Sequence, residues 1–267
     1  MKREFAVVGI VAALAIGLLA GWFIPSPIPT GGTRTSLLDT IQTRGYIKIG
    51  TSADYPPFEF MNISADPPKI VGFDVDVCNW IAEELGVTIQ WTDRSFGGLI
   101  ASCYVGNVDM VAAAMTYNEN RSSYLAASIT YVTVGQAVIV KNNSVLTISS
   151  LSDLDGTNVG VQAGTTLYND LVAAGVTTIT THITVDALIL DLIGGGVEAA
   201  YIDEPVFTTW SKTYDLKVIL RTGTEEFALW IRYGEPELLY EINQVIHESF
   251  LDGRMYDALA KWLNTTV

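Results

Sequence analysis

Apolar and polar residues along this chain fall into blocks whose periodicity changes from one block to the next. Apolar positions recur at every fourth residue from Val77 to Leu85 and from Leu238 to Phe250, which is typical of helices that cover a sheet. The segments 45–50 and 87–91, before and after the first of these helices, predict strands. Because strands and helices alternate over most of the chain, we predict a protein of the α/β class.

The alternation occurs in two blocks, which predicts two lobes. We expect residues 35–134 and 225–267 to form the first lobe, and residues 135–224 to form the second. The apolar segment 129–140 and the amphipathic segment 227–232 are expected to carry the chain between the lobes. Each lobe should then contain a mixed sheet flanked by helices, and two strands should join the lobes.

The strongest candidate site lies in the sequence DMVAAAMTYNENR, residues 109–121. Val111–Met115 predicts a buried strand, and Thr116 with the residues after it supplies the turn and cap chemistry of a helix start. Arg121 in the first turn of that helix is unfavourable for the helix dipole unless an anion shares the site. The stretch therefore predicts a carboxylate pocket, or alternatively a surface arginine paired with Glu119 or a nearby aspartate.

Two further segments carry candidate polar groups. Thr165 and Thr166 begin a predicted helix after a strand and a glycine turn, which places hydroxyl and N–H groups together. Asp203 ends an apolar strand, at the edge of a sheet where α/β proteins bind ligands. Asp203 would suit an ammonium group, or it could cap the helix that begins at Pro205. An arginine for a carboxylate and an aspartate for an ammonium group together describe an α-amino acid ligand.

Aromatic residues accompany these groups. Tyr55 and Phe58 lie in a loop that two prolines hold extended, although Phe58 is expected to pack on the sheet. Phe96 precedes two glycines at a helix start, an arrangement in which the ring can cover a cavity.

Composition narrows the function classes. The net charge of −14 with only 15 Lys plus Arg argues against nucleic acid as a partner. The two histidines have no neighbours with metal-ligand spacing, and Asp74 and Asp76 are explained as helix caps, so we expect no metal site and no cofactor. The chain has no nucleophile, P-loop or dinucleotide motif, which favours binding over catalysis.

The N-terminal segment predicts export. Two basic residues precede the uncharged segment 5–24, which a Pro/Gly-rich linker follows up to residue 34. We favour an uncleaved membrane anchor over a cleaved signal, with the globular part outside the cell membrane. Export would permit a bridge between Cys78 and Cys103, but their positions favour two free, buried thiols. Sequons at Asn62, Asn120, Asn142 and Asn264 would allow glycosylation.

Several motifs in the same order resemble one family. They are TSADYPPFEF, VGFDVDVCNWIAEELG, FGGLIASCYVGNVDMVAAAMTYNENR, LDGTNVGVQAGTT, VEAAYIDEP and DGRMYDALAKW. The chain after residue 35 is similar to the polar amino-acid family of type II periplasmic solute-binding proteins, the receptors of ABC importers. The resemblance implies two lobes that close on a free amino acid and a monomeric protein that delivers it to a membrane permease.

The resemblance also implies roles for individual residues. Arg121 would hold the ligand carboxylate with Thr116 and the backbone of Ala114, and Thr165–Thr166 would contact it from the second lobe. Asp203 would accept the ammonium group, while Tyr55 and Phe96 would sandwich the ligand side chain.

One position departs from the family. Many members that bind basic amino acids carry an aspartate where this chain has Ser52, and here the aspartate of that loop is Asp54. We therefore predict a neutral polar ligand such as glutamine, unless Asp54 or an acid of the second lobe compensates. Two alternatives remain: an exported enzyme similar to cyclohexadienyl dehydratases, with Asp54 or Glu204 as general acid, and a ligand-sensing ectodomain.

Overall fold

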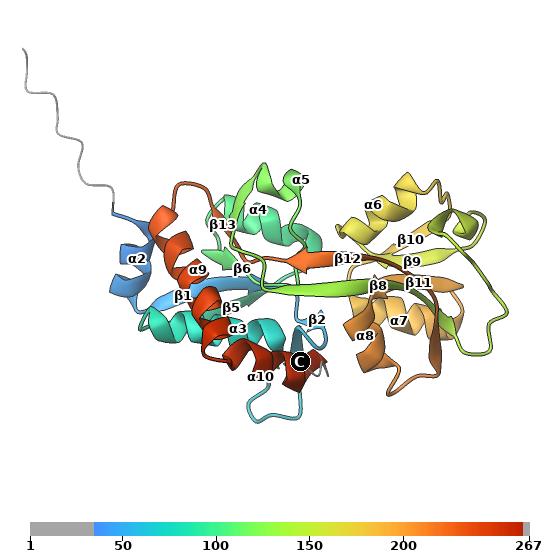
Figure 1. Ribbon diagram of the computed structural model, residues 1–267, viewed down its shortest axis with the longest axis horizontal. Helices are drawn as coiled ribbons and strands as arrows, with labels where there is room; N and C mark the ends of the chain where they lie inside the picture. The colour runs from blue at the N-terminus through green and yellow to red at the C-terminus, as the bar shows by residue number, and fades with distance from the viewer. Residues whose placement is uncertain (1–34, 264–267) are drawn as a thin grey trace, which may run out of the picture. The chain divides into compact units, whose positions relative to one another are not determined.

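The computed structural model describes residues 35–263, and the segment from Ser36 onward forms one compact unit (Figure 1). The predicted export segment 1–34 and the sequon at Asn264 lie outside the described residues. Within residues 35–263, no helix has both the length and the apolar character that crossing a membrane requires.

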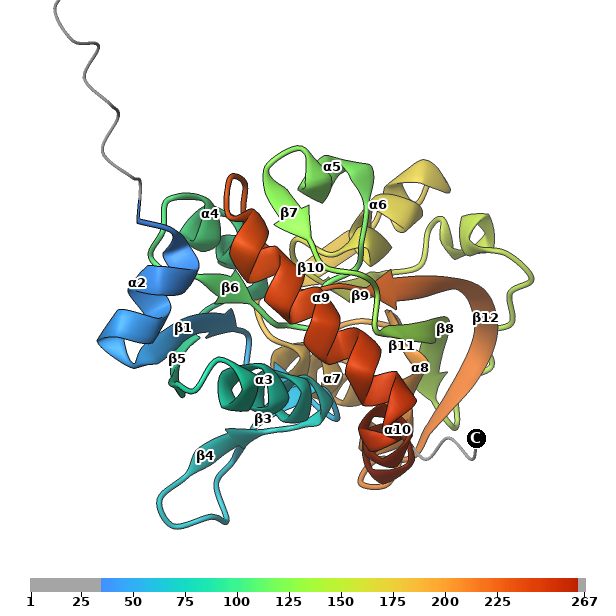
Figure 2. The ribbon, with the colours of Figure 1, turned by 60° about the vertical axis from the view of Figure 1, so that its left-hand side comes forward.

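The first lobe is built on a mixed five-stranded sheet of order β5-β1-β6-β13-β7. β1 is parallel to β5 and β6, whereas β13 is antiparallel to β6 and β7. The strands are β1 (Tyr46–Thr51), β5 (Thr88–Asp93), β6 (Met110–Val111), β7 (Leu125–Ala127) and β13 (Trp230–Arg232). The helices of this lobe are α2 (Leu37–Arg44), α3 (Phe73–Glu84), α4 (Leu99–Tyr104), α5 (Glu119–Ser122), α9 (Pro236–Leu251) and α10 (Arg254–Leu263), with the 3₁₀ turn η1 (Phe96–Gly98). Figure 2 shows α9 running across the lobe, where it packs on α3.

The second lobe is a mixed sheet of order β10-β9-β11-β8-β12. Its strands are β8 (Val132–Lys141), β9 (Val159–Gln162), β10 (Ile179–His182), β11 (Ala199–Asp203) and β12 (Leu216–Phe227). Its helices are α6 (Thr166–Ala173), α7 (Val185–Gly194) and α8 (Glu204–Trp210), with the 3₁₀ turn η2 (Leu151–Leu154). The predicted α/β class and the mixed sheets flanked by helices are therefore confirmed.

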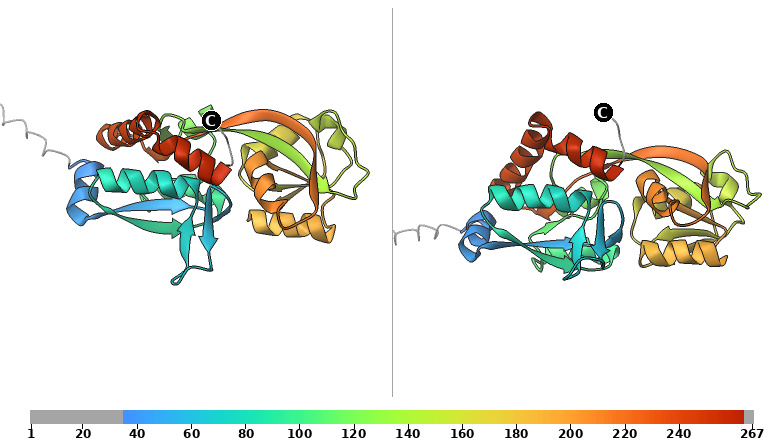
Figure 3. Two further views of the ribbon diagram at one scale, coloured as in Figure 1. Left: turned by 60° about the horizontal axis from the view of Figure 1, so that its bottom comes forward. Right: turned by 90° about the horizontal axis from the view of Figure 1, so that it is seen from below.

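β8 and β12 join the lobes as one long antiparallel pair, which Figure 3 shows from two sides. Their register runs from Lys141 opposite Leu216 to Val132 opposite Phe227. The expected return crossing at 227–232 was wrong, because β12 continues through the polar segment after Leu220 and makes the crossing itself. Register shifts between Val218 and Leu220 and between Arg221 and Thr224 keep the pair in contact across that segment.

A small antiparallel sheet connects β1 to α3. It consists of β2 (Asp54–Tyr55), β3 (Glu59–Asn62) and β4 (Lys69–Val71), and it includes the hairpin expected at 62–69. In this sheet Tyr55 pairs with Glu59. Two residues of neighbouring β-strands that pair directly carry their side chains on the same face.

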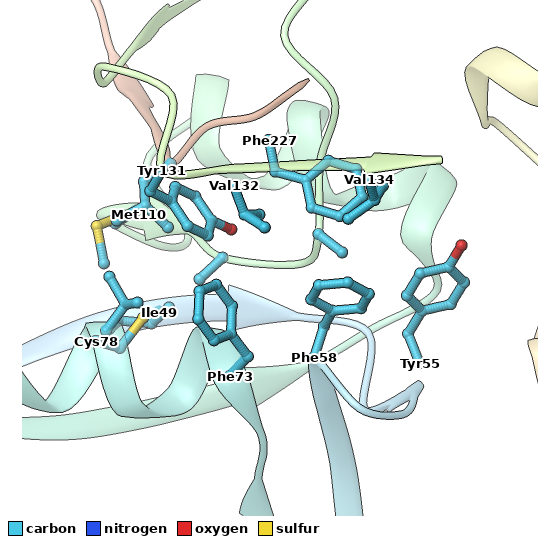
Figure 4. Close-up of a cluster of buried hydrophobic side chains, with 14 of the residues drawn as sticks. Ile49, Tyr55, Phe58, Phe73, Cys78, Met110, Tyr131, Val132, Val134 and Phe227 are labelled. Atoms are coloured by element: carbon cyan, nitrogen blue, oxygen red, sulfur yellow. The ribbon is translucent and has the colours of Figure 1, made fainter. Parts of the chain in front are cut away.

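Aromatic rings pack where this small sheet meets the crossing strands (Figure 4). The ring of Phe58 lies 6.0 Å from Tyr55, 6.2 Å from Phe73 and 5.3 Å from Phe227, and Phe73 stacks on Tyr131. Phe58 is fully buried, so its expected packing role is confirmed. These contacts fix the loop that carries Tyr55 against the first lobe.

The segment after β6 departs from the prediction. β6 ends at Val111 instead of continuing to Met115, although residues 112–115 stay buried. Ala114 adopts a left-handed conformation with φ of 45°, and the carboxylate of Asp74 accepts a hydrogen bond from its N–H at 2.8 Å. The chain leaves the sheet because this turn is incompatible with strand geometry.

The prediction that Asp74 and Asp76 cap the helix is wrong. The N-cap position of α3 is Gly72, and neither acid caps the helix with its side chain. Asp74 is buried and holds the turn at Ala114, while Asp76 accepts hydrogen bonds from Lys261 and Trp262 of α10. Their carboxylates therefore hold other segments against α3.

The two cysteines are free and buried, as expected from their positions. Burial raises the pKa of both thiols, that of Cys103 to about 12. Both thiols therefore stay protonated at neutral pH and have little nucleophilic character.

Candidate ligand-binding site

A cavity of about 20 Å³, room for about one water molecule, lies between the two lobes. Nine of the ten residues predicted for the site line it: Ser52, Tyr55, Phe96, Ala114, Thr116, Arg121, Thr165, Thr166 and Asp203. Five residues that the sequence analysis did not single out complete the lining: Glu59, Ala113, Gln162, Leu167 and Glu225.

Arg121 is a buried cation at the wall of the cavity, with 5% of its surface exposed. The side chain of Asn118 caps α5 by accepting a hydrogen bond from the N–H of Arg121. The guanidinium donates to the backbone oxygens of Thr116 at 2.7 Å and of Gly164 at 3.3 Å, and it lies over the ring of Phe96.

No carboxylate of the described residues forms an ion pair with Arg121. The alternative of a surface arginine paired with Glu119 is therefore wrong. Burial lowers the pKa of Arg121 to about 10, so the side chain remains charged at neutral pH. A buried positive charge that has only carbonyl partners is complemented best by an anion in the cavity.

Asp203 faces Arg121 from the second lobe. It is buried at the end of β11, and its Oδ2 accepts a hydrogen bond from the hydroxyl of Tyr55 at 2.6 Å. Its Oδ1 has no hydrogen-bond partner within residues 35–263, and its side chain does not cap α8, so the capping alternative does not account for it. Burial, followed by the nearby charge of Glu225, raises the pKa of Asp203 to about 8. The free oxygen can accept a hydrogen bond from a cationic donor in the cavity.

Glu225 of β12 links the two lobes at the cavity. Its carboxylate accepts a hydrogen bond from the hydroxyl of Thr116 at 2.5 Å, and a second one from the hydroxyl of Thr166. Both threonine hydroxyls are therefore engaged by the chain itself. The guanidinium of Arg121 still has N–H groups beyond its two bonds to backbone oxygens, and these can bind a ligand.

Glu59 is the second acid that the sequence analysis missed. Only 1% of its surface is exposed, and neither carboxylate oxygen has a hydrogen-bond partner in the part of the chain that the structure describes. Burial raises the pKa of Glu59 well above its usual value, and the charges of Asp74, Asp54 and Asp203 act in the same direction. A buried carboxyl without partners in a cavity wall is free to bind a donor.

The turn before α6 brings the lobes close together. Gly164 has a φ of 84°, and a Cβ atom at this position would lie 3.0 Å from the Cα atom of Gly97 in the first lobe. Only glycine fits a left-handed backbone with so little space. Thr165 follows as the N-cap residue of α6 and donates its hydroxyl to the backbone oxygen of Gln162.

Asp54 is the one predicted site residue that does not line the cavity. Its carboxylate accepts hydrogen bonds from the N–H of Val185 at 2.6 Å and from the side chain of Gln162 at 3.2 Å, both in the second lobe. The hydroxyl of Ser52 donates to its other oxygen. Asp54 thus lies at the start of α7, where a negative charge is favourable for the helix dipole.

The geometry agrees with what comparison with known proteins finds. The family described as bacterial extracellular solute-binding proteins, family 3, matches residues 47–265. This chain belongs to that family. The family assignment and the two-lobe fold expected from the sequence are thereby confirmed.

Individual relatives cover nearly the whole chain. The L-cystine-binding protein TcyJ of Escherichia coli (strain K12) is 28% identical over 265 residues, which is 97% of this chain and 96% of that protein. A mutant of ArgBP from T. maritima superposes with a TM-score of 0.80 and 31% identity, covering 85% of this chain and 99% of the other. The ancestral amino acid-binding protein AncCDT-1, a precursor of cyclohexadienyl dehydratase, superposes with a TM-score of 0.78 and 30% identity over the same shares.

Proposed function

We propose that this solute-binding protein captures a free α-amino acid in the cavity between its lobes. Arg121 binds the α-carboxylate and Oδ1 of Asp203 accepts the α-ammonium group. One observation carries the proposal: a buried guanidinium and a buried carboxyl group face the same cavity from different lobes, and within residues 35–263 neither has an ion-pair partner. A zwitterionic amino acid supplies a partner for each group, its carboxylate for Arg121 and its ammonium group for Asp203.

Other groups that line the cavity would contact the ligand once Arg121 and Asp203 hold its charged ends. The N–H groups at the start of α6, around Thr165 and Thr166, assist with the carboxylate, and Tyr55 and Phe96 cover the ligand side chain. The N–H of Ala114 is engaged by Asp74, so Ala114 shapes this wall of the cavity without donating to the ligand. Because the partners lie on both lobes, the ligand stabilises the closed arrangement more than an open one. We place the lobe boundaries at residues 134–135 and 224–225, which fall within the crossing strands β8 and β12.

We further propose that the protein works at the outer face of the cell membrane. In this account segment 1–34 exports or anchors it, and it acts as a monomer that delivers its ligand to the permease of an ABC transporter. The family membership supports this role, since the family consists of extracellular solute-binding proteins.

For the ligand we propose a neutral polar amino acid such as glutamine. Ser52 lines the cavity without a charge, and Asp54 is turned to α7 instead of the cavity. The relatives named for cystine and arginine show that members of this fold take different side chains. In this proposal Asp203 and Arg121 bind the ammonium and carboxylate groups that all α-amino acids share. The preference for one side chain depends on the other residues that line the cavity.

A thermal-shift screen over the twenty amino acids should identify the ligand, because a ligand that binds only the folded protein raises its melting temperature. Arg121→Ala should then weaken binding of that ligand by about 30-fold or more in calorimetry, since a buried charge contact is lost. Arg254→Ala, which removes a half-buried arginine that pairs with Asp252 away from the cavity, is the matched control and should bind normally. Unchanged affinity in Arg121→Ala, in a protein that melts normally, would refute the carboxylate assignment.

The enzymatic alternative has a separate test. Neither proposed general acid lines the cavity, because Asp54 contacts α7 and Glu204 pairs with Arg221. Incubation with prephenate or arogenate should therefore give no turnover. Release of the aromatic product at a rate that depends on Asp203 or Glu59 would show a dehydratase instead.

A further inference from the structure

We propose that Glu225 is an internal competitor of the ligand. Its carboxylate occupies the hydroxyl groups that the α-carboxylate of the ligand needs, and it must turn away when an amino acid binds. The inference rests on the proposed function, since Arg121 and Asp203 bind the charged ends of the ligand. It adds a residue of the crossing strand β12 that sets the affinity for every amino acid, whatever its side chain.

Glu225 lies on β12, the strand that crosses from the second lobe to the first (Figure 1). Its carboxylate accepts a hydrogen bond from the hydroxyl of Thr116 in the first lobe at 2.5 Å, and another from the hydroxyl of Thr166 in the second lobe. The resemblance to the family predicts both threonines as partners of the ligand carboxylate. Because the carboxylate of Glu225 already engages both hydroxyl groups, a second carboxylate cannot accept from them at the same time.

The size of the cavity requires a side chain to move. The cavity has room for about one water molecule, whereas an amino acid is several times larger. A closed cavity that holds an amino acid therefore needs a different position of at least one lining residue. Glu225 is suited to move, because both of its hydrogen-bond partners are neutral side-chain hydroxyl groups and it forms no ion pair within residues 35–263.

A ligand can displace Glu225 because the strongest donor of the site is left to the ligand. The guanidinium of Arg121 donates to the backbone oxygens of Thr116 and Gly164. A ligand carboxylate that reaches Arg121 gains a charge-assisted hydrogen bond that Glu225 does not make. After burial, the charge of Glu225 has the largest effect on the pKa of both Arg121 and Asp203, so this charge lies close enough to repel an incoming carboxylate.

Pairs of ligands isolate the competition for the carboxylate position. Glutamine and arginine are titrated by calorimetry beside their α-carboxamides, which keep the ammonium group and carry no carboxylate. Glu225→Ala should raise the ratio of amino-acid affinity to carboxamide affinity by about tenfold, because the competing carboxylate is gone. A change in the charge of Asp203 affects both members of a pair and cancels from this ratio.

The rates of binding give a second readout. An internal competitor acts on the free protein, because it lowers the fraction of molecules that are ready to bind. Stopped-flow tryptophan fluorescence should therefore show faster association in Glu225→Ala, with a much smaller change in the dissociation rate. A residue that contacts the bound ligand would instead change mainly the dissociation rate.

Two further variants separate competition from folding. Glu225→Gln keeps the size of the side chain and removes its charge, so it should raise the affinity ratio by less than Glu225→Ala does. It tests the proposal even if Glu225→Ala does not fold. Glu226→Ala changes the exposed neighbour on the same strand, which does not line the cavity, and it should leave the ratio and both rates unchanged.

The outcomes distinguish this proposal from the proposed function. If amino acids bind the wild type and the ratio does not rise in either variant of Glu225, the competition is refuted and the binding of the zwitterion stands. Weaker binding through faster dissociation would also refute it, because Glu225 would then be a ligand contact. If neither the wild type nor Glu225→Ala binds any of the twenty amino acids, both proposals are refuted.

Discussion

Asp203 is a carboxyl group whose protonation the ligand should control. Without a ligand, burial and the neighbouring Glu225 raise its pKa to about 8, so the group is mostly protonated at neutral pH. A bound ammonium group favours the ionised form, which lowers the pKa. Ligand binding is therefore coupled to the loss of a proton below pH 8, and affinity should rise as the pH increases toward that value.

The proton is measurable by calorimetry in buffers with different ionisation enthalpies. At neutral pH the wild type should release about one proton per bound ligand, whereas Asp203→Asn should release none from this site. Asp203→Asn should also bind more weakly, because a neutral amide accepts poorly from an ammonium group. Equal proton release in both proteins would mean that Asp203 does not titrate with binding.

The sequence marks some of these residues and not others. Arg121 and Asp203 lie at the ends of predicted elements, where their charge is either unfavourable or unused, so local reasoning found both. Glu59 and Glu225 lie within strands, and nothing in their neighbours along the chain shows that they reach a cavity. Their roles depend on contacts with Thr116 and Thr166 or on burial, which only the tertiary structure determines.

At the scale of elements, the contact of Asp54 with α7 is the clearest link between the lobes outside the cavity. A carboxylate at the first N–H of a helix both accepts a hydrogen bond and complements the dipole. Because Asp54 belongs to β2 and Val185 to the second lobe, the bond exists only while these two elements are together. It should therefore stabilise the closed arrangement.

Asp54→Ala should weaken ligand affinity by about fivefold, the equivalent of one helix cap, with most of the change in a faster dissociation rate. Stopped-flow tryptophan fluorescence measures that rate. Asp93→Ala is the matched control, because Asp93 accepts a hydrogen bond from Ala53 within the first lobe. Identical dissociation rates in the two variants would show that the contact between β2 and α7 does not contribute to closure.

The bounds of two strands differ from those that the periodicity of the sequence predicts. The helices and most strands agree with the sequence, because each has a long periodic pattern or a clear glycine stop. β6 is shorter than predicted since Asp74 holds Ala114 in a turn, and β12 is longer since its bulges carry it past Gly223. Both differences come from partners distant in sequence, one on α3 and one on β8.

At the scale of the whole Ser36–Val267 unit, two crossing strands and a cavity between lobes are the features that carry function. The alternation of elements predicted two lobes, and the ordered motifs predicted the family. Sequence alone could not show which surfaces of the lobes meet. The close approach of Gly97 and Gly164 and the bond between Tyr55 and Asp203 answer that question.

The central claim is that both charges of an amino acid are bound, one by each lobe. The most direct measurement is a calorimetric titration of the wild type with its ligand and with the α-carboxamide of that ligand, which keeps the ammonium group and loses the carboxylate. Our account predicts that the carboxamide binds about 30-fold more weakly or worse, because Arg121 is left without its anion. Equal affinities for the two compounds would contradict it.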